Sequence, residues 1–532
     1  MIESGRLGRV VVAEPFDDRG IAILERAGAD VISCVGAPRA TLHAALHEAR
    51  GLIVRSETRV DGDLLARAPR LEVVARAGAG VDAIDVDAAT AAGIVVVNTP
   101  GANTIAAAEH TFAMLLSALR HVPQAYASVR ASQWERKLFV GHELYGKTLG
   151  IVGLGRIGSN VAARASAFGM HVIAHDPYVP ASRAGALGVE LCELDELLAT
   201  AHVVTLHVPL TPQTRGMIGP CALATMRDDA VLVNCARGAV VDADALLRAL
   251  DAGRLLVAVV DVVPEEPPPA ASASARLLAH DRVVATPHLG GTTFEALERI
   301  ALEIAEDVVR VLGGRPASGA VNAPTLSGAA AEGAGGFVDL AFRMGALLPQ
   351  LFEDALRAEI GLVLQGDLAG VGSEPFVAAL LAGALPFVTD RRVTIVNALA
   401  VAADIGVRTM VSSESSPHQF RASLAIATGE HRLVGTVLPT GARIVEIDRF
   451  EIDAVAEGTM LVTRHRDVPG MVGRIGTILG NADVNISTMQ VARGRRGGSA
   501  MMVLDVDRSV GHDVLDAIGA VDGIEGVRLV SI

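Results

Sequence analysis

The chain has 532 residues, of which 51% are hydrophobic and only 3% aromatic, and its formal net charge is −14 at pH 7. This length exceeds what one hydrophobic core supports, and the acidic balance disfavours nucleic acid as a partner. No apolar run reaches the roughly 18 residues of a membrane span, no signal-peptide pattern is present, and four scattered cysteines disfavour disulfides or a metal site. We therefore expect a cytoplasmic protein of several domains.

Short apolar runs alternate with amphipathic segments over the N-terminal part of the chain. Strands are predicted at 9–13, 51–54, 71–75 and 94–97. A helix at 21–27 is predicted between the first two. This alternation is typical of a small open α/β domain. A longer helix, predicted at 103–120, leads from that domain into the next region of the chain.

A glycine-rich turn follows the next predicted strand. Gly153, Gly155 and Gly158 form the pattern G-x-G-x-x-G, a helix is predicted after them, and Asp176 ends the strand that follows. Such glycines allow a tight turn, the approach of a pyrophosphate to backbone N–H groups, and close packing of helix on strand. Asp176 can accept hydrogen bonds from an adenosine ribose and would repel a 2′-phosphate. The unit therefore predicts a site for NAD rather than NADP.

Three groups with useful chemistry follow later strands of this region. The predicted strands are 149–152, 171–175, 203–206, 230–233, 256–260 and 282–285. Arg237, after the fourth of these, offers a guanidinium fork for a carboxylate, and Glu266, after the fifth, can orient an imidazole. His288, after the sixth, offers an imidazole that can take up and release a proton. Since open α/β sheets bind ligands at this edge, the trio predicts hydride transfer to or from a 2-hydroxy acid.

The remaining chain divides into a returning helix, a linker and two further regions. The helix, predicted at 293–312, is expected to pack back on the first domain and make it discontinuous. The predicted boundaries are 1–100 with 288–315 for a substrate domain, 101–287 for a coenzyme domain, 316–336 for a Gly/Ala/Pro/Ser-rich linker, 337–455 for a third region and 456–532 for a last one.

The third region carries no motif that names a chemistry. Strands are predicted at 360–365, 420–427 and 433–438, and helices at 375–382 and 396–405. The last region has the order strand, helix, strand, strand, helix, strand, which is typical of a ferredoxin-like unit. These six elements are predicted at 459–463, 470–479, 484–491, 500–506, 511–520 and 527–530.

Four motifs together resemble those of the D-isomer-specific 2-hydroxyacid dehydrogenases, and within them the D-3-phosphoglycerate dehydrogenases. They are V-G-L-G-R-I-G (152–158), N-C-A-R-G-A-V-V-D (234–242), D-V-V-P-E-E-P (261–267) and T-P-H-L-G (286–290). The likeness covers residues 1 to about 312, and 459–532 resembles an ACT domain, an amino-acid-sensing module. The resemblance implies an α/β fold with two Rossmann-like or flavodoxin-like domains across a cleft, an intervening α+β allosteric domain and a ferredoxin-like ACT domain.

The resemblance also implies a reaction. The expected activity is NAD-dependent oxidation of 3-phospho-D-glycerate to 3-phosphohydroxypyruvate, the first step of phosphorylated L-serine biosynthesis. Feedback inhibition by L-serine and a homo-oligomer, either dimer or tetramer, are expected with it. By this likeness Arg237, Glu266 and His288 are the catalytic trio.

Further site residues follow from the same likeness. The implied NAD contacts are Gly153, Gly155, Arg156, Ile157, Gly158, Asp176, Val208, Pro209, Cys235, Ala236, Arg237, Asp261, His288, Gly290 and Gly291. The implied substrate contacts are Arg55, Ser56, Arg76, Gly78, Ala79, Asn103 and, from a neighbouring subunit, Arg136. The implied contacts for the serine effector are His465, Asp467 and Asn485.

Some positions depart from the family pattern. Ala79 and Val208 replace hydroxyl side chains that are common in relatives, which predicts a modest effect on coenzyme affinity. Glu451 and Val455, near the basic Arg443, stand where some bacterial members have cationic groups. We therefore expect no phosphate-linked substrate inhibition there.

Two other functions stay open at this point. A glyoxylate, hydroxypyruvate or D-lactate type of reductase would use the same trio, although Arg55, Arg136 and the sensor-like tail favour a phosphorylated substrate. A nucleotide-sensing scaffold could share the fold without efficient turnover. Turnover of phosphorylated against unphosphorylated substrates separates the first alternative, and a partner-binding groove with weak turnover would indicate the second.

Overall fold

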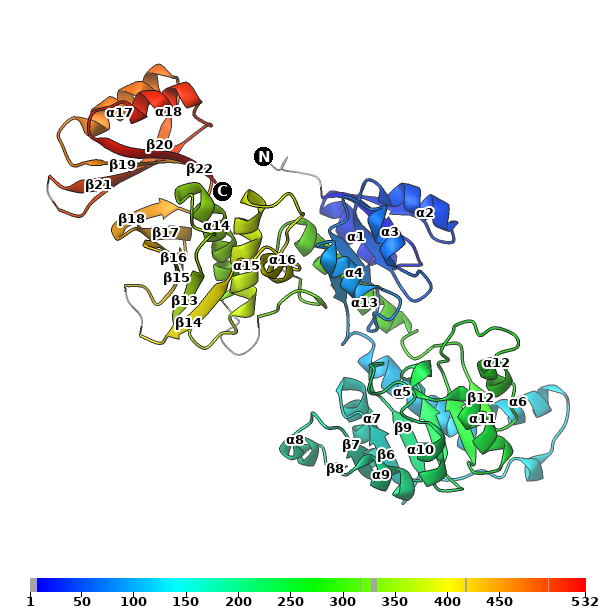
Figure 1. Ribbon diagram of the computed structural model, residues 1–532. Coiled ribbons are helices and arrows are strands. Elements are labelled where there is room, and N and C mark those ends of the chain that lie inside the picture. Colours follow the sequence, from blue (N-terminus) through cyan, green and yellow to red (C-terminus); the bar gives the residue numbers. More distant parts are fainter. Residues whose placement is uncertain (1–6, 316, 327–332, 417–418, 496) are drawn as a thin grey trace. The chain divides into compact units, whose positions relative to one another are not determined.

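The computed structural model describes residues 7–315, 317–326, 333–416, 419–495 and 497–532. Contacts divide the chain into two compact units, one of residues 1–60, 75–84 and 97–319, the other of 61–74, 85–96 and 320–532. Four sheets carry the strands of these units (Figure 1). The mixed α/β fold class predicted from the sequence is confirmed.

The first sheet has the strand order β2-β1-β3-β4-β5. Its strands are β1 (Gly8–Val12), β2 (Ala29–Ser33), β3 (Ala49–Val54), β4 (Val73–Arg76) and β5 (Val95–Asn98). The helices between them are α1 (Asp18–Arg26), α2 (Arg39–Leu46), α3 (Gly62–Ala66) and α4 (Val86–Ala91). Strand β1 pairs in parallel with both β2 and β3, so the carboxyl ends of β1 and β3 meet at one edge. The four predicted strands and the helix α1 are confirmed, whereas β2 and α2 to α4 were not predicted individually.

The second sheet has seven parallel strands in the order β12-β11-β10-β9-β6-β7-β8. The strands are β6 (Thr148–Val152), β7 (His171–His175), β8 (Glu190–Leu191), β9 (Val203–Leu206), β10 (Val231–Asn234), β11 (Val257–Val260) and β12 (Val283–Ala285). Six of them were predicted, and only the two-residue β8 was not. In this order the ends of β10, β11 and β12 are neighbours, which places the loops after them side by side.

Both faces of this second sheet are buried. Alternate residues of β10 belong to different apolar clusters, with Val231 and Val233 in one and Leu232 in the other. The first cluster includes side chains of α5 (Thr104–Leu119) and α7 (Arg156–Ala167), and the second includes those of α9 (Leu194–Thr200), α10 (Pro220–Thr225) and α11 (Ala243–Asp251). Burial on both faces explains why these strands are runs of Val, Leu and Ile rather than alternating patterns. Each such side chain contributes about 1.5–3 kcal/mol.

A long helix returns from the second sheet to the first domain. Helix α13 (Phe294–Leu312) begins at Thr293, whose side chain accepts a hydrogen bond from the Ala296 N–H at 3.2 Å. It packs against α1, where Arg19 forms an ion pair with Glu298. The helix predicted at 293–312 is confirmed, and its contact with α1 agrees with the expected packing on the first domain. The remaining helices of this unit are α6 (Val122–Arg130), η1 (Arg136–Leu138), α8 (Ala181–Ala186), η2 (Gly238–Val240) and α12 (Ala273–Leu278).

The third sheet is mixed, with the order β14-β13-β15-β16-β17-β18. Its strands are β13 (Ile360–Gly366), β14 (Thr409–Glu414), β15 (Ala422–Thr428), β16 (His431–Leu438), β17 (Gly441–Ile447) and β18 (Phe450–Val455). Its helices are α14 (Gly335–Leu351), α15 (Glu374–Ala384), η4 (Leu385–Phe387) and α16 (Ala398–Asp404). All five predicted elements are confirmed, while α14, β14, β17 and β18 were not predicted. Residues 316 and 327–332 of the predicted linker lie outside the described residues.

The fourth sheet is antiparallel and has the order β20-β21-β19-β22. Its elements are β19 (Thr459–Arg466), α17 (Met471–Asn481), β20 (Ile486–Arg493), β21 (Ser499–Val506), α18 (His512–Gly519) and β22 (Ile524–Ser531). The predicted ferredoxin-like order is therefore confirmed. Among the described residues, no helix combines the length and the apolar character needed to cross a membrane.

Candidate active site

The glycine-rich turn connects β6 to α7 with the geometry that a dinucleotide site needs. Gly153 has φ +95°, and a Cβ at this position would lie 2.7 Å from the His207 carbonyl oxygen. Gly158 packs so closely on Gly153 that a Cβ would collide with its carbonyl oxygen. In front of Gly155, by contrast, no heavy atom lies within 4 Å of a Cβ position. This open space at the helix N-terminus fits a pyrophosphate bound by N–H groups of Arg156 and Ile157.

Asp176 lies directly after β7, beside the glycine-rich turn. Its Oδ2 accepts a hydrogen bond from the Leu154 N–H at 2.8 Å, and its Oδ1 accepts one from the Tyr178 N–H at 2.9 Å. These bonds fix the carboxylate next to the turn, where an adenosine ribose is expected. Val208 and Pro209 follow β9, the neighbouring strand on the other side of β6.

Asp261 is the buried anchor of the loop that carries His288. It is 2% exposed and accepts hydrogen bonds from Thr286 Oγ1 at 2.6 Å, Leu289 N at 2.8 Å and Gly290 N at 3.0 Å. His110 Nε2 lies 3.2 Å from the same carboxylate. Burial raises the pKa of Asp261, but hydrogen bonds from His110, Thr286 and Leu289 outweigh it, so the pKa is lowered. The carboxylate therefore stays charged and orders the loop.

His288 and Glu266, which the sequence predicts to act together, are in contact. His288 Nδ1 lies 2.7 Å from Glu266 Oε2, and each side chain is about one-third exposed, at 35% and 34%. Glu266 Oε1 also accepts a hydrogen bond from the Val263 N–H at 3.1 Å, which orients the carboxylate. The His288 backbone has φ +56° and donates its N–H to the Asp261 carbonyl oxygen at 2.8 Å. A left-handed non-glycine residue costs about 1–3 kcal/mol, and such strain is common at functional sites.

Arg237 lies beside the turn 77–80, which follows β4 in the first domain and contains Gly78 and Gly80. Its Nε donates to Asp82 Oδ2 at 2.7 Å, and its Nη1 donates to the Ala236 carbonyl oxygen at 2.7 Å. The end of the guanidinium lies so close to Gly80 that a Cβ there would collide with Nη2. Asn234 shapes the turn before Arg237, because it accepts from the Ala236 N–H and donates to the Arg237 carbonyl oxygen. The Cys235 thiol is neutral, since burial and Asp261 raise its pKa to about 12.

Arg55, Arg76 and Arg237 form a cluster of positive charge near the end of β4. Burial lowers the pKa of Arg76 to about 10, and the positive charges of Arg237 and Arg55 add to the lowering. The negative charges of Asp82 and Glu14 oppose it. An anionic ligand would relieve the repulsion among the guanidinium groups. The cluster therefore suits a small acid with more than one negative charge.

Two of the other predicted substrate residues, Gly78 and Ala79, lie in the turn that follows Arg76. Gly78 has φ +143° and packs against the Arg76 guanidinium, and Ala79 accepts a hydrogen bond from Asn98 through its carbonyl oxygen. Asn103 is close to Gly291, and its buried Oδ1 has no hydrogen-bond partner within the described residues. This atom can accept a hydrogen bond from a ligand. Arg136, by contrast, lies in the exposed η1 segment.

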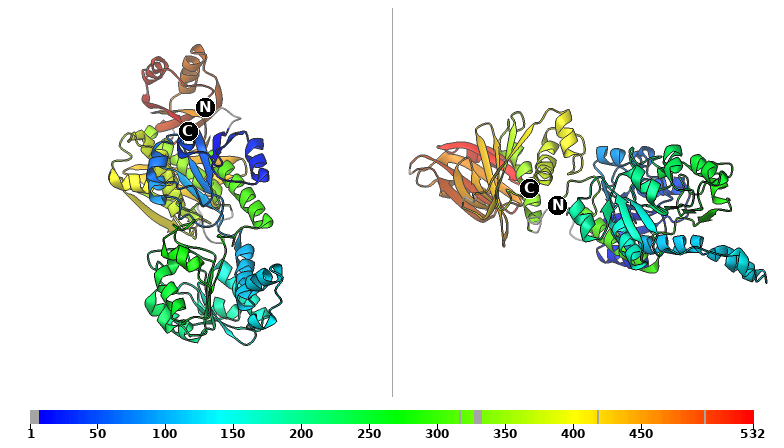
Figure 2. Two further views of the ribbon diagram at one scale, coloured as in Figure 1. Left: turned by 90° about the vertical axis from the view of Figure 1, so that its right-hand side faces the viewer. Right: turned by 90° about the horizontal axis from the view of Figure 1, so that it is seen from below.

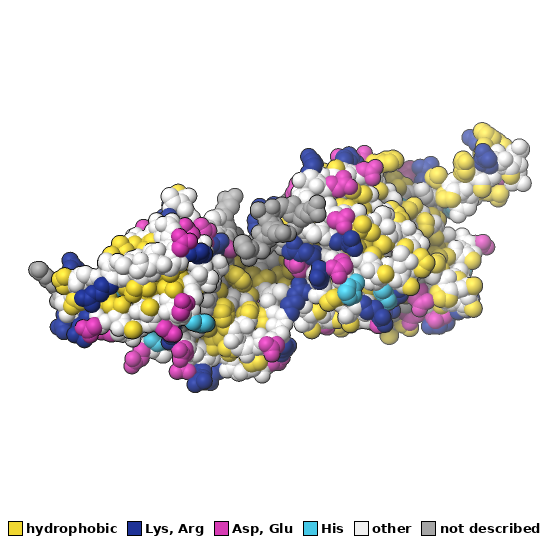
Figure 3. Space-filling view, turned by 90° about the horizontal axis from the view of Figure 1, so that it is seen from above, with side chains coloured by type: hydrophobic (Ala, Val, Ile, Leu, Met, Phe, Trp, Pro, Cys, Tyr) yellow, Lys and Arg dark blue, Asp and Glu magenta, His cyan; other side chains and the backbone are white. Residues whose placement is uncertain are grey.

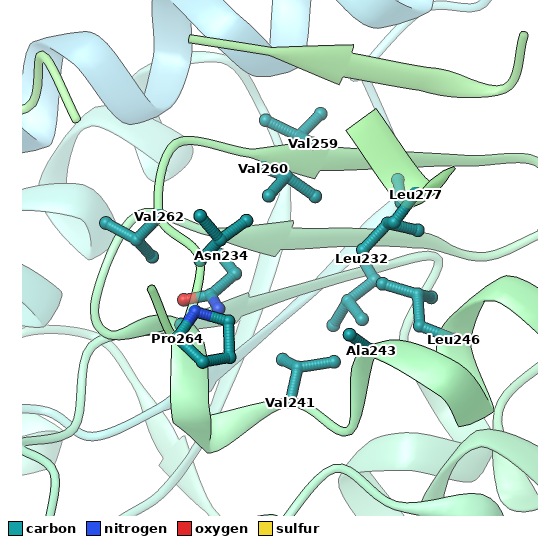
Figure 4. A pocket seen from close by; sticks show the side chains of 13 residues that line it. Leu232, Asn234, Val241, Ala243, Leu246, Val259, Val260, Val262, Pro264 and Leu277 are labelled. Carbon is teal, nitrogen blue, oxygen red and sulfur yellow. The ribbon is translucent and has the colours of Figure 1, made fainter. Parts of the chain in front are cut away.

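A small pocket under the Arg237 loop is not the substrate site. It lies between β10, β11 and α11 and is lined mainly by apolar side chains such as Leu232, Val260 and Leu246 (Figure 4). Its volume is about 10 Å³, which is enough for about one water molecule. Neither His288 nor Glu266 lines it.

The three predicted effector residues lie at one end of β19 and before β20. His465 is 2% exposed, and burial lowers its pKa. Asp467 Oδ2 accepts from the Gly497 N–H at 3.1 Å and lies 3.7 Å from Arg493 Nη1. Asn485 is exposed and donates its Nδ2–H to Asp507 Oδ2 at 2.8 Å. Asp467 and Asn485 thus each have a partner within the same chain.

Sequence reasoning missed three residues that shape this site. Asp82 holds Arg237, while His110 and Thr286 hold Asp261. Asp82 stands two positions after Gly80, so its place beside the turn 77–80 was a usable signal. The sequence offered no such signal for His110, because its contact with Asp261 depends on how α5 packs against β11 and β12. Within the described ranges, no group of three or more His, Cys, Asp or Glu side chains is placed to hold a metal ion.

Three segments of the chain match known families. Residues 112–290 match the NAD-binding domain of D-isomer-specific 2-hydroxyacid dehydrogenases, 334–448 match the D-3-phosphoglycerate dehydrogenase intervening domain, and 459–523 match the ACT domain. The region in which the sequence showed no nameable motif is thereby assigned to a domain family.

Complete relatives and solved structures extend this likeness. The chain is 39% identical to the D-3-phosphoglycerate dehydrogenase of Synechocystis sp., covering 100% of this chain and 96% of that one. It is 42% identical to the D-3-phosphoglycerate dehydrogenase of Mycobacterium tuberculosis, covering 91% and 92%. Among solved structures, the D-lactate dehydrogenase of Aquifex aeolicus with NAD and lactic acid is 30% identical, with a TM-score of 0.52 over 57% of this chain and 96% of that chain.

Proposed function

Because the chain belongs to the D-3-phosphoglycerate dehydrogenase family, we propose that it oxidises 3-phospho-D-glycerate at C2 to 3-phosphohydroxypyruvate with NAD. The observation that carries the chemistry is the 2.7 Å contact between His288 Nδ1 and Glu266 Oε2. It lies at the sheet edge from which Arg237 also projects. The products feed phosphorylated L-serine biosynthesis.

The histidine–glutamate pair defines where the proton goes. When the Glu266 carboxylate accepts the Nδ1–H, the neutral His288 has its lone pair on Nε2. That nitrogen can take the proton of the C2 hydroxyl while the C2–H bond breaks and the C=O bond forms. Glu266 then stabilises the imidazolium that results. In the reverse direction the same Nε2–H returns the proton.

The NAD site supplies the other half of the reaction. When bound, NAD supplies a hydride acceptor at its nicotinamide ring. The open space before Gly155 and the carboxylate of Asp176 would hold its pyrophosphate and ribose, and the loop at Gly290 and Gly291 would border its nicotinamide end.

The arginine cluster would bind the anionic groups of the substrate. Arg237 would form paired hydrogen bonds with the C1 carboxylate, since a guanidinium fork offers two parallel N–H groups. Arg55 and Arg76 would receive the phosphate. Such local positive charge also attracts a doubly anionic substrate to a protein of net charge −14.

A comparison of substrates tests the proposed function against its nearest alternative. We expect kcat/KM for 3-phosphohydroxypyruvate to exceed that for hydroxypyruvate, glyoxylate and pyruvate, measured as NADH consumption. A preference for any unphosphorylated acid would instead support a general D-2-hydroxyacid dehydrogenase, and no turnover of any would support the scaffold.

Coenzyme choice gives a prediction about Asp176. Asp176→Asn retains an acceptor for the Leu154 N–H but removes the charge that repels a 2′-phosphate. Since like charges in contact cost several kcal/mol, the ratio of kcat/KM for NAD over NADP should fall about 10²-fold. Asp195→Asn, an exposed residue of α9, is the matched control and should leave the ratio unchanged. An unaltered ratio in Asp176→Asn would remove this residue from coenzyme selection.

The ACT domain gives a prediction about feedback. We propose that L-serine inhibits the enzyme by binding at His465, Asp467 and Asn485, with Asp467 receiving its ammonium group. Asp467→Ala should abolish inhibition by L-serine and leave activity without serine at the wild-type level, as measured by dose–response curves. Asp513→Ala, in the first turn of α18, should keep normal sensitivity. Wild-type inhibition of Asp467→Ala would refute the effector site.

The exposed segment formed by α6 and the residues after it suggests which surface binds a second subunit. Helix α6 has no buried residue, and apolar side chains along it and after it are exposed, including Tyr126 at 66% and Trp134 at 76%. This cyan helix extends outward in the right-hand view of Figure 2, and in Figure 3 the segment shows apolar and basic side chains. Exposed apolar patches mark interaction sites. We propose that it contacts a second copy of the chain and brings Arg136 to that copy's substrate.

A further inference from the structure

We propose that Glu14 is a positioning residue that holds the 55–58 turn, and with it Arg55, for recognition of the substrate phosphate. The inference rests on the proposed function and deepens it. Neither the motifs nor the family likeness assigns Glu14 a role. It follows β1, and the turn follows β3, which pairs with β1 in parallel.

Four consecutive backbone N–H groups converge on this one carboxylate. Oε1 accepts from Arg55 N at 2.8 Å and Thr58 N at 2.9 Å, and Oε2 accepts from Ser56 N and Glu57 N, both at 3.1 Å. Glu14 is only 6% exposed. An uncompensated charge at such a depth would be costly, so these four bonds are what allow it. Burial raises the pKa of the carboxyl, but the backbone hydrogen bonds outweigh it and the pKa is lowered.

The converging N–H groups form the kind of concavity that binds anions. Because Glu14 fills it, the concavity is closed to phosphate, and the substrate anion is left to the Arg55 and Arg76 side chains. The same bonds fix the backbone from which the Arg55 side chain extends. Glu14 also reaches this cluster through its charge, which acts on Arg76. It can therefore influence specificity without touching the substrate.

The test uses a glutamine of nearly the same size. In Glu14→Gln one carboxylate oxygen becomes an NH₂ group that cannot accept the N–H groups facing it, so the turn should lose its fixed geometry. We expect the ratio of kcat/KM for 3-phosphohydroxypyruvate over hydroxypyruvate to fall about tenfold. Affinity for NADH should stay at the wild-type value, because the coenzyme residues are untouched.

A double-mutant cycle separates positioning from general stabilisation. If Glu14 acts through Arg55, Glu14→Gln should change the ratio less than about twofold in an Arg55→Ala background. Asp307→Asn is the matched control, since Asp307 is 5% exposed and accepts two backbone N–H groups, from Ser318 and Gly319, both at 2.8 Å. It should lower Tm without changing the ratio.

Several outcomes would overturn the proposal. An unchanged ratio in Glu14→Gln, or a full additional loss in the Arg55→Ala background, would show that Glu14 serves stability alone. If Glu14→Gln does not fold, Glu14→Asp keeps the charge but shortens the side chain, and a wild-type ratio there would be equally decisive. A wild-type enzyme without preference for the phosphorylated acid would instead contradict the proposed function.

Discussion

His288→Ala is expected to lower turnover of 3-phospho-D-glycerate by about 10²–10⁴-fold, the usual contribution of a general acid–base. The reason is that the imidazole paired with Glu266 is the group proposed to take the C2 hydroxyl proton. Affinity for NADH, measured by fluorescence titration, should remain near the wild-type value. The loss should therefore appear in kcat rather than in coenzyme binding.

The control for this variant is another histidine. His47 lies in an exposed pair with Glu48, and its side chain is 69% exposed, so His47→Ala should retain wild-type turnover. Should His288→Ala turn over at a rate within a factor of about two of wild type, His288 could not be the acid–base.

Arg237→Ala is expected to lower kcat/KM for 3-phospho-D-glycerate about 10²–10³-fold. Truncating one partner of a hydrogen-bonded charge pair costs about 2–5 kcal/mol, and each 1.4 kcal/mol is a factor of ten. Arg237→Lys should recover only part of this loss, because an ammonium cannot present two parallel N–H groups to a carboxylate. Steady-state kinetics of the two variants measure both effects.

Arg248→Ala provides the matched control for Arg237. Arg248 is an exposed residue of α11 in the same domain, and its removal should leave kcat/KM unchanged. The folded state of Arg237→Ala should persist, since Asp82, its partner, is 46% exposed and can be hydrated. Equal activity of Arg237→Lys and wild type would argue against paired recognition of the carboxylate.

The sequence was most informative where strands are buried on both faces. Strands β6, β10, β11 and β12 were predicted because their apolar runs end at Gly153, Asn234, Asp261 and Thr286. Some of the elements that were missed have no buried residue. Edge strand β14 carries polar residues at four of its six positions and edge strand β2 at two of five, and α6 has no buried residue to create a periodic pattern.

Helix α14 was missed for a different reason. Its first residues belong to a Gly- and Ala-rich stretch, which local propensity assigns to a linker. Phe337, Leu340 and Met344 are buried in the apolar cluster that α14 shares with the third sheet, and this burial stabilises the helix despite its low helix propensity. Tertiary packing therefore decided this segment, as it does for most helices.

Site residues show a similar division. His288, Glu266 and Arg237 could be predicted because each follows its own strand of one parallel sheet, and the structure confirms the contact of the first two. Glu14 could not, because Arg55, the first of its partners, is 41 positions away. The position of Asp82 after Gly80 was a usable signal, but its pairing with Arg237 spans 155 positions. Such contacts depend on strand pairing and domain packing rather than on local spacing.

The most direct test of the proposed chemistry is a crystal structure with NADH and 3-phosphohydroxypyruvate bound. We expect the C2 oxygen within about 2.6–3.2 Å of His288 Nε2, the carboxylate on Arg237 and the phosphate on Arg55 and Arg76. A complex in which the C2 oxygen lies out of reach of His288, or in which the acid binds away from Arg237, would contradict the proposed function.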